Sequence, residues 1–126
     1  MAGQPKSFKV AATLERYRIV GPNSGTADTV SYPENEAHAV FGVTLEEAID
    51  ATSCIPVAGP GEIAKVLFNQ TVLAGGLVAG DASGRGVAPT VTTAGTYVIG
   101  HLIGPSVALT GSVLDVYINP HFQSIP

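Results

Sequence analysis

The sequence is poor in cysteine, tryptophan, methionine and charge. It contains one cysteine (Cys54), one methionine and no tryptophan, and only 13% of its 126 residues are charged. A single cysteine excludes an internal disulfide and any metal site built from several cysteines. Polar and apolar residues alternate over 52–57 around Cys54. This pattern predicts a strand in which the thiol is buried as a small hydrophobic group.

Basic residues are few and dispersed. The chain has six Lys and Arg residues against ten acidic ones, and its formal net charge is −4. No basic block exists that could follow a phosphate backbone, so we expect no nucleic-acid partner. The charged fraction is about half the roughly 25% that is usual for soluble domains. Such a sparsely charged exterior favours an oligomer or a subunit of a larger assembly. The alternative is a monomer with a neutral surface.

Long uninterrupted hydrophobic runs are also missing. Residues 1–6 lack the apolar core of a signal peptide. The most apolar span, Tyr97–Ile118, is interrupted by Gly, Pro and Asp and is rich in β-branched residues. It therefore predicts two strands around a turn and not a membrane span. We expect no membrane partner and synthesis in a cytoplasm.

Short apolar runs separated by turn residues dominate what is present. The clearest example is Val72–Gly100, where Asp81 and Arg85 are the only charged residues. Such runs, bounded by Gly, Asp, Ser and Thr clusters, are typical of short strands joined by tight turns. The sequence thus predicts a mainly β fold, a compact β-barrel or β-sandwich of short antiparallel strands.

One short helix is predicted within this β fold, at about residues 44–51. Thr44 and Glu47 match the capping box, in which a hydroxyl and a carboxylate each satisfy a free backbone N–H. Glu46, Glu47 and Asp50 would form a solvated acidic face. Paired carboxylates can also serve acid–base catalysis, but capping is a sufficient explanation for them here.

The sequence predicts a flexible N-terminal arm, residues 1–10, followed by a single β-rich domain, residues 11–126. Two interpretations of Phe8–Ala12 remain open: a first strand, or an extended segment that docks on a partner. Val20, Val40 and Gly42 recur as Val78, Val98 and Gly100. This offset of 58 residues leads to the hypothesis of a two-module pseudo-repeat.

Catalytic and ligand-binding motifs are not found. His38, His101 and His121 are widely separated, and none has a partner at metal-ligand spacing. No G-x-S-x-G elbow occurs, and the glycines near Gly75 lack the spacing of a nucleotide-binding fingerprint. We therefore expect no catalytic residue, cofactor, metal or small-molecule substrate.

Asp81 and Arg85 lie in a glycine-rich turn and allow two interpretations. They form an ion pair across their own turn, or Arg85 reaches a neighbouring subunit.

Several motifs, taken in order, resemble a known family. They are V-F-G-V at 40–43, then L-F-N-Q-T-V-L-A-G-G-L-V-A-G-D-A-S-G-R-G-V-A-P at 67–89, G-T-Y-V-I-G at 95–100 and V-L-D-V-Y-I at 113–118. This order resembles the capsid decoration (cement) proteins of tailed bacteriophages, from about Tyr17 to Ile118. The segments at 44–51 and 104–112 depart from the pattern.

The resemblance implies a structural virion protein that binds the outer surface of the phage head and stabilises the capsid. It implies a homotrimer that clamps neighbouring major capsid subunits. Its interface residues would be Lys6, Phe8 and Lys9 of the arm, together with Asp81 and Arg85 of the turn. An alternative from another class is a head-fibre or tail-associated module that recognises a host surface or carbohydrate. An enzyme is the third option.

Overall fold

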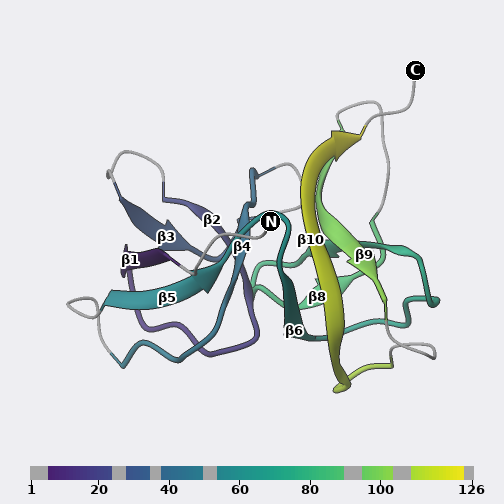
Figure 1. The fold of residues 1–126 in the computed structure, drawn as a ribbon, viewed down its shortest axis with the longest axis horizontal. Coiled ribbons are helices and arrows are strands. Elements are labelled where there is room, and N and C mark those ends of the chain that lie inside the picture. The colour runs from purple at the N-terminus through teal and green to yellow at the C-terminus, as the bar shows by residue number, and fades with distance from the viewer. Residues whose placement is uncertain are drawn as a thin grey trace.

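The fold consists of two five-stranded β units that follow each other along the chain (Figure 1). The computed structural model describes residues 6–23, 28–34, 38–49, 54–89, 95–103 and 109–123. The strands of the first unit are β1 (Lys6–Val10), β2 (Ile19–Pro22), β3 (Thr29–Ser31), β4 (Gly42–Thr44) and β5 (Cys54–Ala58). Those of the second are β6 (Ile63–Leu67), β7 (Leu77–Gly80), β8 (Gly86–Val87), β9 (Thr96–Leu102) and β10 (Val113–Gln123).

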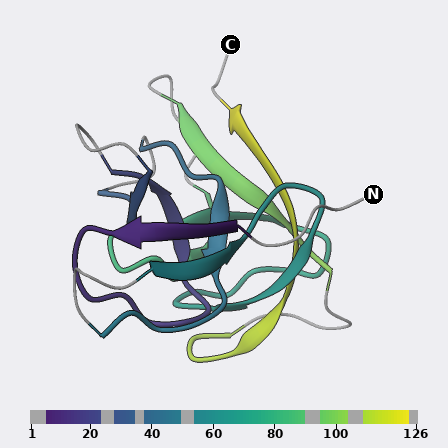
Figure 2. The same cartoon turned by 60° about the vertical axis from the view of Figure 1, so that its left-hand side comes forward.

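The first unit is a closed barrel with the strand order β1-β3-β2-β4-β5. Its ring closes where β1 pairs with β5, as seen in Figure 2. The mainly β, barrel-containing fold predicted from sequence is therefore confirmed. One pairing, β1 with β3, is parallel, although only antiparallel strands were predicted. The reason is geometric, because a closed ring with an odd number of strands cannot have every neighbour antiparallel.

The second unit is a sheet with the order β6-β10-β9-β7-β8. A single parallel bridge joins Phe68, just after β6, to Gly86 in β8. This bridge brings together the two ends of the sheet. It occupies the same place in the strand order as the parallel β1–β3 pair of the barrel.

The two units also share their ladder registers. Ile19 pairs with Val43 in the barrel, and Leu77 pairs with His101 in the second sheet, so both positions shift by 58 residues. This correspondence matches positions of one unit with positions of the other. The common origin of the two units stays a prediction.

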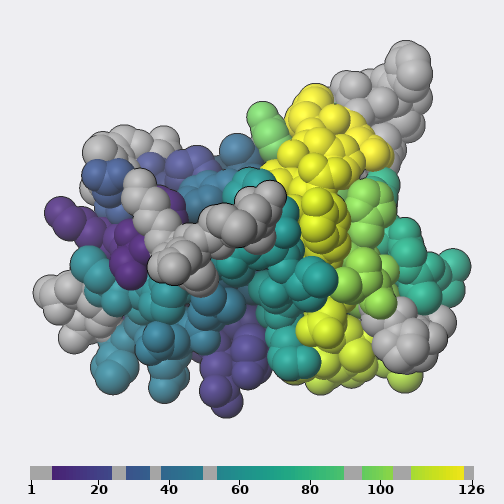
Figure 3. All heavy atoms as spheres, viewed as in Figure 1, coloured from purple at the N-terminus to yellow at the C-terminus, as the bar shows by residue number. Residues whose placement is uncertain are grey.

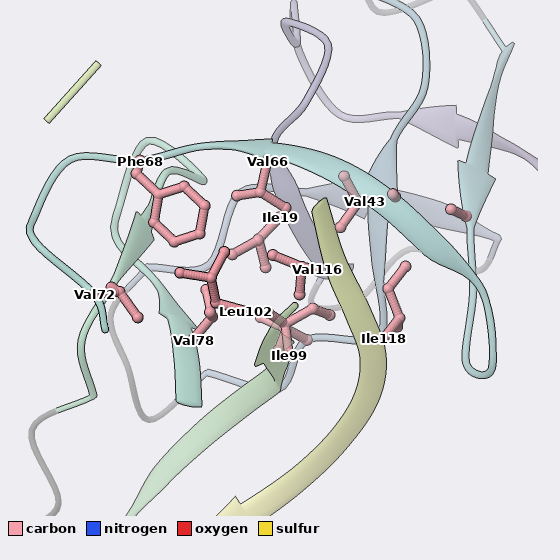
Figure 4. Close-up of a cluster of buried hydrophobic side chains, with 13 residues drawn as sticks. Ile19, Val43, Val66, Phe68, Val72, Val78, Ile99, Leu102, Val116 and Ile118 are labelled. Carbon is pink, nitrogen blue, oxygen red and sulfur yellow. The ribbon is translucent and has the colours of Figure 1, made fainter. Parts of the chain in front are cut away.

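Two hydrophobic clusters hold the fold together. The smaller cluster fills the barrel and contains Val10, Leu14, Val20, Val30, Ala48, Ile55 and Val57. The larger one combines barrel residues such as Ile19 and Val43 with Val66, Phe68 and Val78 of the second unit (Figure 4). Because its side chains come from both units, the barrel and the sheet share one buried interior.

The predicted helix at 44–51 is wrong for its described part, residues 44–49. Thr44 ends strand β4, and Ala48 forms an antiparallel bridge with Leu14. The buried Thr44 hydroxyl donates to the Glu15 carbonyl (2.7 Å) and accepts from the Arg18 amide (3.0 Å). The local capping signature does not lead to a helix, because the Thr44 hydroxyl bonds to the backbone of Glu15 and Arg18 instead. Asp50 and Ala51 lie outside the described residues.

The described residues contain no helix long and apolar enough to cross a membrane.

The predicted flexible arm is wrong for residues 6–10. Strand β1 pairs with β5 on one side and β3 on the other, so these residues are part of the barrel wall. Of the two interpretations of Phe8–Ala12, the first strand is the one observed. Residues 1–5 lie outside the described part of the chain. Cys54 begins β5, as the predicted strand requires, but its thiol is exposed and not buried.

Candidate functional site

The turn after β7 is organised by the Asp81 carboxylate. Its Oδ1 accepts hydrogen bonds from the backbone amides of Ser83 and Arg85, both at 2.9 Å. Its Oδ2 accepts from Asn69 Nδ2 and from Arg85 Nε, both at 3.2 Å. One side chain thus satisfies two backbone and two side-chain donors, which is a common role of Asp in tight turns.

This turn packs against the barrel. The Arg18 guanidinium donates to the Ser83 carbonyl (3.0 Å), and the Ile19 amide donates to the Gly84 carbonyl (2.6 Å). Gly84 has φ of +75°, and a Cβ there would lie 2.7 Å from the Tyr32 ring and 2.8 Å from the Ile19 carbonyl. Only glycine fits this junction between the two units.

Of the two interpretations of Asp81 and Arg85, the structure shows the ion pair within the turn (3.2 Å). The Arg85 side chain is nonetheless 37% exposed, against 20% for Asp81. The role of both residues at an interface stays a prediction.

The other predicted interface residues lie on β1. The Phe8 ring packs against Phe41 with a centroid separation of 5.2 Å, so much of its apolar surface serves the barrel. Lys9 is exposed, and Lys6 takes part in the strand by pairing with Val57. β1 belongs to the barrel and the Asp81 turn to the second unit. The structure therefore does not join the five residues into a single contiguous site.

The histidines do not converge on a metal site in the part of the chain that the structure describes. No group of three or more His, Cys, Asp or Glu residues there could hold an ion. His38 Nδ1 lies 3.0 Å from the Ala39 carbonyl. The His101 and His121 rings stack with centroids 6.2 Å apart on neighbouring strands.

Two open hollows lie near residues 44–49. One has a volume of about 380 Å³ and is lined by Arg16, Leu45, Glu46 and Glu47. The other, of about 440 Å³, is lined by Thr13, Leu14, Glu15, Tyr32, Glu47, Ala48 and Ile49. Neither described lining includes a histidine or a cysteine. The glutamates that line the hollows therefore have no histidine or cysteine beside them in the described lining.

An exposed apolar surface covers the outer side of β6 and β10. We call it the β6–β10 face and define it by the side chains of Ile63, Lys65, Leu67, Val113, Asp115 and Tyr117. They form three cross-strand pairs: Ile63 with Tyr117, Lys65 with Asp115, and Leu67 with Val113. The intervening residues, such as Val66 and Val116, point into the core (Figure 4). None of the motifs singled out in the sequence predicts this face.

The signal for this face is present in the sequence. In I-A-K-V-L and V-L-D-V-Y, apolar residues occupy both alternating sets of positions, apart from the central Lys65 and Asp115. A strand with one solvated face would carry polar residues at every second position. The two strands could therefore have been read as having two apolar faces.

Comparison with solved structures shows a likeness of fold. No protein-family model and no curated protein matches the chain. Among solved structures, the N base of the head fiber gp8.5 of bacteriophage phi29 is similar, with a TM-score of 0.67 and 15% sequence identity. The match covers 90% of this chain and 92% of that chain. At this level of identity the likeness establishes the fold, which the chain shares over nearly its whole length with a module of a phage head fiber.

Proposed function

We propose that this chain is a structural protein of a phage virion that binds the outside of the assembled head. The observation that carries the proposal is the fold shared with the phi29 head-fiber N base over 90% of this chain. The low charge of the sequence agrees with a protein that meets other protein over much of its surface.

In this proposal the chain stabilises the capsid by clamping neighbouring major capsid subunits, and it does so as a homotrimer. The physical basis is mass action. A protein that binds only the assembled shell favours it by RT ln(1 + [L]/Kd) at each site, and a shell offers many equivalent sites. No enzymatic step, cofactor or nucleic-acid partner is needed for this role.

A second function is favoured by the same structural match. The matched protein is the base of a head fiber, so this chain would serve as a module of a head fibre and not as a cement. Shell stability separates the two roles. A cement raises the temperature at which empty expanded heads come apart, whereas a fibre base binds the heads and leaves that temperature unchanged.

Co-sedimentation with empty expanded heads tests the proposed binding. The heads should be those assembled from the major capsid protein encoded with this chain. The full chain should pellet with the heads at a fixed ratio and remain in the supernatant without them. If the chain stays in the supernatant at every concentration, the proposed function is wrong.

The same assay tests the predicted interface residues. Lys9→Glu and Arg85→Glu should each weaken binding several-fold if the exposed Lys9 and the partly exposed Arg85 meet an acidic shell surface. Arg16→Glu is the matched control, because Arg16 is also exposed and the change in charge is the same. Equal losses in all three variants would mean that net charge matters and that the named positions do not.

A further inference from the structure

We propose that the β6–β10 face is the surface through which copies of this chain contact one another. The inference deepens the homotrimer of the proposed function and rests on that part of it. In Figure 3, teal atoms of the part of the chain that includes β6 adjoin the yellow atoms of β10.

Exposure is the first observation. Ile63 is 59% exposed, Tyr117 41% and Val113 37%, and all three project from the same side of one sheet. Ile103, 47% exposed, lies beside them, since its amide donates to the Asp115 carbonyl. Large apolar side chains gathered on one sheet face, and not scattered singly, are typical of a protein interface.

The matched strand positions of the barrel show whether this kind of strand pair needs large apolar residues on its outer side. In the barrel, Phe8 of β1 pairs with Ile55 of β5, and in the second unit Val66 of β6 pairs with Leu114 of β10. Treating these two pairs as equivalent aligns β1 with β6 and β5 with β10. By this alignment, the barrel positions that match Lys65, Leu67, Val113 and Asp115 hold Ser7, Lys9, Cys54 and Pro56. At the two apolar positions the barrel thus has a lysine and a cysteine. The strand architecture therefore does not demand large apolar residues there.

The charges on the face indicate which partner fits it. Lys65 Nζ and Asp115 Oδ1 are 3.4 Å apart, and both side chains are about half exposed, 56% and 48%. The face thus carries one positive and one negative charge side by side, flanked by apolar pairs at each end. A partner with the same arrangement is complementary to it, and a second copy has that arrangement.

Symmetry makes the match specific. If copies pack around an axis parallel to β6 and β10, then β6 of one copy faces β10 of the next. Lys65 of one copy then lies against Asp115 of the next, and Ile63 against Tyr117. The same crosswise pairing holds for two or three copies around the axis, so it is compatible with the proposed trimer.

Sedimentation equilibrium of the full chain tests this inference. The wild-type protein should associate at micromolar concentrations. Ile63→Asp and Tyr117→Asp should each weaken association roughly tenfold or more, because each places a charge inside an apolar contact. Leu73→Asp is the matched control, since Leu73 is 67% exposed on another segment, and it should associate like the wild type. Circular dichroism should show that all the variants remain folded.

A charge-swap pair tests the crosswise contact without relying on apolar residues. Lys65→Asp and Asp115→Lys should each associate more weakly than the wild type. A mixture of the two variants should recover association, because the carboxylate introduced on β6 of one copy then meets the ammonium group introduced on β10 of the other. An ion pair that served only within one chain would show no recovery on mixing.

A monomeric wild type overturns the inference, and so does a Leu73→Asp variant that loses association as much as Ile63→Asp. Failure here is distinguishable from failure of the proposed function. A monomer that still sediments with heads contradicts the self-association surface and the homotrimer, and it leaves the proposed head binding standing. An oligomer that does not bind heads contradicts only the function.

Discussion

Gly42 in β4 and Gly100 in β9 occupy matched positions of the two units and are packed in the same way. A Cβ on Gly42 would lie 2.5 Å from the Ala58 carbonyl oxygen of the neighbouring β5. A Cβ on Gly100 would overlap the Tyr117 carbonyl oxygen of the neighbouring β10. In both units a strand thus passes against its neighbour at a distance that only glycine permits.

The first prediction concerns these glycines. Gly42→Ala and Gly100→Ala should each lower the free energy of unfolding by about 1–3 kcal/mol or more, because backbone must shift to admit the methyl group. Gly59→Ala is the control, since its Cβ would meet only Glu62 Oε1 at 3.8 Å. Urea denaturation measures all three. If the Gly42 and Gly100 variants unfold at the same midpoint as Gly59→Ala, the close approach does not exist in solution.

The second prediction concerns Thr44. Thr44→Val keeps the shape of the side chain but leaves the Glu15 carbonyl and the Arg18 amide without this partner, at a cost of about 1–3 kcal/mol. Thr44→Ser keeps the hydroxyl and should cost only about 1 kcal/mol for the lost methyl group. Thermal unfolding compares the two variants. A larger loss in Thr44→Ser than in Thr44→Val would contradict the bonds described here.

The third prediction concerns the Asp81 turn. Asp81→Ala removes the acceptor for two backbone amides, so we expect a loss of about 1–3 kcal/mol in the free energy of unfolding. The control is Glu46→Ala, in which an exposed carboxylate is removed. Guanidinium denaturation provides the comparison. Equal stability of the two variants would mean that the hydrogen bonds of the Asp81 carboxylate do not stabilise the turn.

The fourth prediction concerns β1. Deletion of residues 2–10 should unfold the barrel, because β1 closes it by pairing with both β3 and β5. Deletion of residues 2–5, which spares β1, should leave a cooperative unfolding transition. Near-UV circular dichroism and calorimetry distinguish the two deletions. A folded protein without residues 2–10 would show instead that β1 is a detachable arm, as the sequence had suggested.

Alternation and turn chemistry located most of the strands from sequence. The strand predicted around Cys54 became β5, and the two strands predicted within Tyr97–Ile118 became β9 and β10. β10 runs further than predicted. A register shift between Ile118 and His121 lets the strand continue past Pro120 to Gln123. Pro in a strand is tolerated at such irregularities.

The failures came from contacts between segments distant in sequence. Thr44 and Glu47 carry a local helix signature, yet the Thr44 hydroxyl bonds to Glu15 and Arg18, some 26 to 29 residues away. β1 looked like an arm because it is short and follows a polar start. Only the closure of the ring shows that it is needed. A single sequence cannot reveal either of these pairings.

The candidate site was the least predictable part. The ion pair between Asp81 and Arg85 was one of the two interpretations that the sequence allowed. The contacts of their turn with Arg18 and Ile19 of the barrel were not predicted. The β6–β10 face was missed because core and surface positions of these strands are both apolar. Only the tertiary fold shows that Val66 is buried whereas Ile63 is exposed.

Binding to the outside of the head is tested by a cryo-electron microscopy map of heads incubated with the full chain. We expect density for a barrel and an adjoining sheet on the outside of the shell, in contact with at least two capsid subunits at each occupied position. Heads that carry no such density at saturating concentrations of the chain would contradict the proposed binding to the head.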